Sequence, residues 1–92
     1  MITVPGIARG DADVARTLLA TTAEAAVSTG ARAAVSGATR TSDLEEWNFQ
    51  RIEDAESLLA LLEDHRRHGT LAPEVIHAVD RLIAKLTVAV RS

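Results

Sequence analysis

The feature that most constrains the fold is a pair of apolar-periodic segments, 43–68 and 73–91, separated by Gly69. Projected at about 100° per residue, the apolar residues of segment 43–68 fall on one broad arc, which is typical of an amphipathic helix. Segment 73–91 has the cleaner pattern, because large aliphatic residues recur there at alternating spacings of three and four. Gly69 suits the end of the first helix and Pro73 the first turn of the second, so the two segments are predicted to form an antiparallel hairpin. The recurring aliphatic residues of the second segment are Ile76, Val79, Ile83, Leu86 and Val90.

The start of the first hairpin helix is indicated by residues 42–45, which read Ser-Asp-Leu-Glu. This order matches a capping box, in which Ser42 would accept a hydrogen bond from the Glu45 amide while the Glu45 carboxylate reaches back to the Ser42 amide. We therefore expect one continuous helix over 43–68.

The N-terminal part of the chain has weaker signals. Residues 1–10 contain Pro5 and Gly6, which favour an extended arm. Segment 11–29 is rich in alanine and has apolar residues at helical spacing, so it predicts a helix with few large side chains to bury. Segment 30–42 is rich in glycine, serine and threonine and predicts a linker.

Together these segments predict one all-α domain spanning 1–92, an antiparallel helical hairpin with a weaker Ala-rich N-terminal helix. A hairpin by itself would leave half of each apolar arc exposed, and the alanine-rich helix offers little to cover it. We therefore expect either a closely packed three-helix bundle or a larger bundle formed by self-association.

Composition excludes several classes of function. The chain has no cysteine, which removes disulfides, zinc–thiolate sites and thiol catalysis. A net charge of −3 makes binding to nucleic acid an unlikely role, because a broad basic surface is not expected. No apolar run reaches the about 18 residues of a membrane span, and no signal sequence is recognised, so we expect a cytoplasmic protein that does not insert in a membrane.

No catalytic motif is recognised, and we expect neither an enzyme nor a cofactor or metal site. A glycine-flanked serine elbow, a phosphate-cradling Gly-Lys loop and a Ser-His-Asp arrangement are all missing. One alternative is that Glu53 and Glu56 resemble the paired-acid helices of magnesium-dependent nucleotide pyrophosphohydrolases, which would imply a metal-dependent nucleotide hydrolase. Of the facing helix, however, only His77 and Asp80 share that three-residue spacing, so a solvated acidic face is the preferred interpretation.

The candidate contact residues are Trp47, Phe49 and Arg51, because Trp and Arg dominate interface hot spots and Phe49 projects away from the apolar arc as an exposed aromatic. The alternative for Arg51 is local, with its side chain stacked on Trp47 and paired with Asp54. The basic end of the first hairpin helix, His65-Arg66-Arg67-His68, is a secondary candidate. The alternative there is a solvated helix end whose charges suit the helix dipole.

The function predicted from the sequence is therefore a non-enzymatic protein–protein interaction or assembly module that presents amphipathic helices. Its partner would be a protein, and a homo-oligomer is expected from the uncovered hairpin. The principal alternative is a small regulator or inhibitor, antitoxin-like or phage-encoded, that docks onto a host protein.

Overall fold

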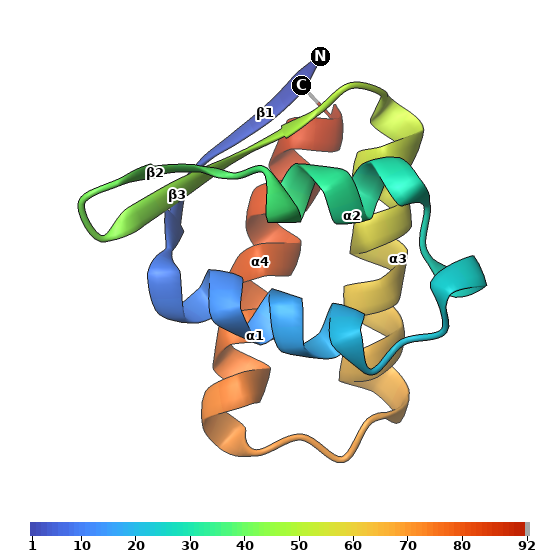
Figure 1. Cartoon of the computed structure of the whole chain (residues 1–92). Helices are drawn as coiled ribbons and strands as arrows, with labels where there is room; N and C mark the ends of the chain where they lie inside the picture. The colour runs from blue at the N-terminus through green and yellow to red at the C-terminus, as the bar shows by residue number, and fades with distance from the viewer. Residues whose placement is uncertain (92) are drawn as a thin grey trace.

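The structure is a computed structural model that describes residues 1–91. Within this range a three-stranded antiparallel sheet, with the strand order β1-β3-β2, packs against helices (Figure 1). The all-α prediction is therefore wrong, and the fold is mixed α/β. In chain order the elements are β1 (Ile2–Ala8), α1 (Arg9–Ala20), the one-turn helix η1 (Glu24–Ala26), α2 (Thr29–Ser36), β2 (Thr39–Thr41), β3 (Leu44–Phe49), α3 (Ile52–His68) and α4 (Pro73–Arg91).

Strand β3 replaces the first turns of the helix that was expected over 43–68. Glu45, Trp47 and Phe49 are buried along this strand, whereas Glu46 and Asn48 between them are only half-buried. Alternation with a period of two places these two sets on opposite faces of the sheet. Trp and Phe also favour strands. The helical interpretation failed because a charged residue, Glu45, holds one of the inward positions and masks the alternation.

The expected capping box is a hairpin turn instead. Thr41 pairs with Leu44, so Ser42 and Asp43 form a two-residue connection between β2 and β3. Ser42 has a φ of 54°, in the left-handed region that turns of this length require. The side chain of Glu45, which was expected to cap a helix, is turned into the core.

The expected N-terminal arm, 1–10, is strand β1 followed by the start of α1. Ile2 pairs with Phe49 and Ala8 with Leu44, and the register shifts by one residue between Val4 and Ile7. Pro5 and Gly6 lie in this bulge, where a missing amide and a positive φ of 69° at Gly6 are tolerated. Pro5 and Gly6, which suggested an extended arm, thus belong to an irregular edge strand.

The helix expected over 11–29 ends early, and the linker expected over 30–42 contains α2 and β2. Arg32 of α2 donates hydrogen bonds to the carbonyl oxygens of Leu19, Thr22 and Ala23, which caps the C-terminal end of α1. Ser28 begins α2, since its hydroxyl accepts a hydrogen bond from the Ala31 amide. Side-chain caps, not apolar periodicity, set these boundaries.

The hairpin is present, with α3 and α4 side by side, and α4 has the bounds that the aliphatic pattern predicted (Figure 1). Their apolar faces are covered by the chain itself, because α1 crosses them and the sheet packs on them. No helix within residues 1–91 combines the length and the apolarity needed to cross a membrane. The fully buried large side chains include Ile7, Trp47, Phe49, Leu58, Leu62, Leu82 and Leu86.

Gly30 marks the closest approach between α2 and α3. A Cβ atom built on Gly30 would lie 2.1 Å from Oδ2 of Asp54. Asp54 has little freedom to move away, since its Oδ1 accepts a hydrogen bond of 2.9 Å from the Ser28 hydroxyl. Gly30→Ala is expected to lower the free energy of unfolding by about 1 to 3 kcal/mol, because the overlap exceeds the gain in helix propensity.

The matched control is Gly10→Ala in α1, where a Cβ atom would meet nothing within 4 Å. This variant is expected to raise the free energy of unfolding by up to about 1 kcal/mol. Urea denaturation followed by the fluorescence of Trp47 measures both. Equal stabilisation by the two substitutions would contradict the close packing of α2 on α3.

Candidate docking groove

The first two candidate contact residues, Trp47 and Phe49, lie in the core and not at the surface. Both are 0% exposed, and their rings meet edge to face with centroids 6.4 Å apart. The expectation of an exposed Phe49 at a helix start is therefore wrong. These residues hold β3 against the helices and are not available to a partner in the folded protein.

Arg51 is the candidate that remains at the surface. It is the N-cap residue of α3, and its Nε lies 3.5 Å from Oε2 of Glu53. Arg51 contacts Asp54 through the backbone, where the Asp54 amide donates a 3.1 Å hydrogen bond to the Arg51 carbonyl, whereas the Asp54 carboxylate accepts from Ser28 and the ring contact of Trp47 is with Phe49. An isolated, exposed ion pair of this kind contributes little to stability.

The basic end of α3 is tied to neighbouring elements. Arg66 donates a 2.8 Å hydrogen bond to Asp80 of α4, and Nε2 of His65 lies 3.3 Å from the Thr22 hydroxyl. Arg67 is exposed. These cations stand at a helix C-terminus, where the dipole favours positive charge.

The acidic residues of the hydrolase alternative, Glu53 and Glu56, are exposed on α3. Among the described residues, no group of three or more histidine, aspartate and glutamate side chains could hold a metal ion. The alternative therefore has no pocket or ligand cluster that favours it.

A buried ion pair between α1 and the sheet is the main feature that the sequence did not reveal. The Glu45 side chain is 0% exposed, and Arg16 of α1 hydrogen bonds to both of its carboxylate oxygens. Arg16 also donates to the Val35 carbonyl, and Arg40 of β2 lies 3.5 Å from Glu45. The hydrogen bonds from Arg16 hold the pKa of Glu45 below its ordinary value, against the opposing effect of burial. This arrangement joins the four elements α1, α2, β2 and β3 around a fully buried carboxylate, so we assign it a structural role.

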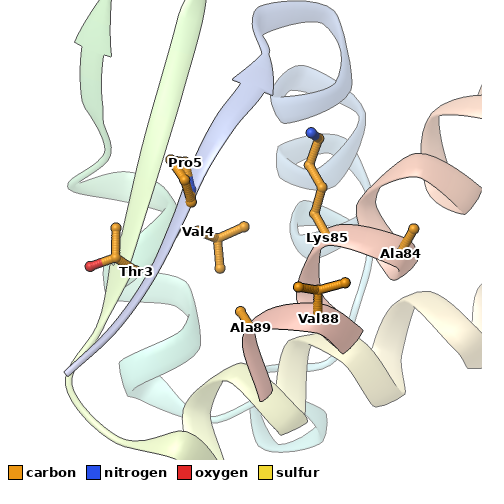
Figure 2. Close-up of a pocket in the computed structure, with 7 residues that line it drawn as sticks. All are labelled: Thr3, Val4, Pro5, Ala84, Lys85, Val88 and Ala89. Carbon is orange, nitrogen blue, oxygen red and sulfur yellow. The ribbon is translucent and has the colours of Figure 1, made fainter. Parts of the chain in front are cut away.

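A hollow with a mainly apolar lining lies between β1 and the C-terminal half of α4. Its volume is about 420 Å³, and its lining is mainly carbon. In Figure 2, Val4 points from β1 toward α4, whereas Lys85 and Val88 rise from α4 on the other side. The lining residues are Thr3, Val4, Pro5, Ala84, Lys85, Val88 and Ala89. We refer to this hollow as the β1/α4 groove.

The β1/α4 groove is open to solvent, since Val88 is 69% exposed. Met1, next to β1, is 84% exposed. Val88 is not part of the aliphatic pattern that predicted α4, because that pattern faces the core. The groove was missed for a second reason as well: one of its walls is β1, a strand that the sequence did not indicate. The only signal in the sequence was Val88, an aliphatic residue outside the core-facing pattern and at helical spacing from Ala84.

The helix wall of the β1/α4 groove is aliphatic except for one cation. Lys85 lines it, and residues 81–91 contain Arg81, Lys85 and Arg91 but no acidic residue. Arg81 is held by two hydrogen bonds, of 2.9 and 2.8 Å, to the carboxylate of Asp11 in α1. The charge of Arg81 is therefore already matched, and the groove is an apolar surface bordered by the positive charge of Lys85.

Comparison of the chain with protein-family models, with curated proteins and with solved structures gives no significant match.

Proposed function

We propose that this protein is a non-enzymatic interaction module that works in the cytoplasm and docks a protein partner in the β1/α4 groove. The observation that carries the proposal is the exposure of Val88 in the lining of an apolar hollow. Apolar hollows bordered by polar groups are typical of protein contact sites, and single exposed aliphatic residues elsewhere on a surface are not.

Two further observations support an interaction surface over a small-molecule site. The groove is built from a strand edge and a helix face, with one lysine as its only charged lining residue. Sites for small substrates usually bring together several convergent polar groups.

The self-association expected from the sequence has lost its original reason, because α1 and the sheet cover the hairpin. A second copy of the chain is one of two occupants of the β1/α4 groove that the experiment below distinguishes, and another protein is the second.

Val88→Glu is expected to weaken binding of the partner at least tenfold. A charge placed in the centre of the groove would be desolvated against apolar atoms, and about 1.4 kcal/mol is enough for a factor of ten. The matched control is His77→Glu, an equally acidic change at an exposed position of α4 outside the groove.

The measurement has two stages. Light scattering of the purified protein first determines whether it self-associates. A photo-crosslinking residue placed at position 88, and separately at position 77, is then used in cells to identify a protein joined from 88 alone. Binding of that protein, once purified, is titrated against the parent and both variants. A dimer dissolved by Val88→Glu supports docking by a second copy, and a heteromeric complex weakened by it supports docking by another protein. Binding that withstands Val88→Glu would overturn the proposal.

A further inference from the structure

We infer that the occupant of the β1/α4 groove is an amphipathic helix of a different protein whose apolar stripe is bordered by aspartate or glutamate. This inference rests on the docking function proposed above and specifies the chemistry of the partner. Two observations carry it. The irregularity of β1 argues against an extended partner, and the charge of α4 favours an acidic partner and disfavours a second copy.

An extended partner strand fits β1 poorly. Addition of a strand needs a row of backbone groups along the free edge. Pro5 has no amide hydrogen, and the bulge between Val4 and Ile7 shifts the register. Only Ile2–Val4 remains regular on the N-terminal side, and strands of three residues are at the short limit. A partner must therefore bind mainly by side-chain packing, which an amphipathic helix laid in a groove provides.

The charges of α4 select an acidic partner. Lys85 is half-buried at the groove, so its aliphatic stem covers apolar surface while the ammonium group reaches the border (Figure 2). Arg91 lies one helical turn after Val88, whereas Arg81, one turn before Lys85, is already paired with Asp11. A carboxylate next to the partner's apolar stripe would meet Lys85, whereas a lysine there would be repelled.

The same charges disfavour a second copy as the occupant. In a two-fold symmetric pair each residue meets the symmetric surface. An antiparallel pairing of two α4 helices about their Ala84–Val88 segments would bring the two Lys85 ammonium groups together. Like charges placed opposite one another weaken association.

The experiment uses a displayed library of 18-residue peptides, selected for binding to the full chain and counter-selected against Val88→Glu. We expect enriched peptides to have aliphatic residues at helical spacing flanked by Asp or Glu. Lys85→Glu should weaken their binding at least about fivefold, and exchanging the flanking acidic residues for lysine should restore binding to this variant. Lys85→Gln, which removes the charge without reversing it, should have the smaller effect. The emission of Trp47 checks that each variant keeps the native core.

The outcomes separate this inference from the docking function. Peptides that depend on Val88 but carry no excess of acidic residues, or that bind Lys85→Glu unchanged, overturn the acidic partner and leave the docking function in place. Peptides with an extended, alternating pattern overturn the helical partner. The absence of any peptide that distinguishes the parent from Val88→Glu overturns both.

Discussion

Replacing Trp47 with alanine is expected to lower the free energy of unfolding by about 3 to 5 kcal/mol, the usual range for removing a large aromatic side chain from a core. Trp47 is fully buried on β3, and its ring packs on the edge of Phe49. The side chain fills space between the sheet and the helices that no neighbour can occupy. A loss of this size is a large fraction of the about 5 to 15 kcal/mol that stabilises a typical domain.

The measurement is thermal and urea denaturation followed by far-ultraviolet circular dichroism, because the variant has no tryptophan. Arg51→Ala is the matched control, since the Arg51 side chain is 76% exposed and was paired with Trp47 in the sequence interpretation. Its expected effect is below about 0.5 kcal/mol. A Trp47→Ala variant with unchanged melting that had lost its partner would instead restore Trp47 as a contact residue.

The second large effect is expected at the buried carboxylate. Glu45→Gln should lower the free energy of unfolding by about 2 to 3 kcal/mol, because Arg16 would keep its charge and lose its buried counterion, with only the exposed carboxylate of Asp13 left beside it. The side chains of Arg16 and Glu45 are 26% and 0% exposed, so solvent can compensate only part of this loss.

The lowered pKa of Glu45 determines the direction in which stability changes with pH. The pKa of Glu45 is lower in the folded protein than its ordinary value of 4.5, so the unfolded chain binds more protons in this pH range. The contribution of Glu45 is complete at pH values above 4.5 and is lost as the pH falls through the lower pKa of the folded state. Glu45→Gln should remove this part of the acid destabilisation.

The control for Glu45 is Glu46→Gln, on the opposite face of the same strand. Urea denaturation at several pH values between about 3 and 7 compares the parent with both variants. An acid limb of the stability curve that is steep in the parent and in Glu46→Gln, and flatter in Glu45→Gln, is the expected result. Parallel curves for all three would show that Glu45 is not the carboxylate responsible.

Residues 73–91 illustrate what can be predicted from local pattern alone. Ile76, Val79 and Ile83 recur at helical spacing, and Pro73 marks the first turn, so both the helix and its bounds follow from short-range information. Gly69 likewise separates the two hairpin helices. Where one face of an element is apolar and its ends carry strong signals, the sequence is sufficient.

The sheet could not be predicted in this way because its inward face includes a charge. Glu45 is acceptable there only because Arg16, from a helix earlier in the chain, lies against it. Likewise β1 contains Pro5 and Gly6, which are unfavourable in a regular strand and acceptable in a bulge at the edge. Both exceptions depend on partners distant in sequence, which a reading of local periodicity does not include.

The β1/α4 groove was missed because predicting it requires both the helix α4 and the strand β1. Val88 lies on a helix that was predicted, but the groove exists only where β1 lies beside that helix. The residues chosen from the sequence, Trp47 and Phe49, were selected for their chemistry while their environment was unknown. Aromatic character indicates a hot spot only when the side chain reaches the surface.

The pairing of β1 with β3 has a consequence for the order in which the protein assembles. Ala8 and Leu44 are the paired residues of β1 and β3 that lie nearest in sequence. Hydrogen bonding between the two strands therefore requires closure of a loop that contains α1, α2 and β2. The helices α3 and α4 meet across a short turn. Because closing a long loop is entropically unfavourable, we expect α3 and α4 to pack together before β1 pairs with β3.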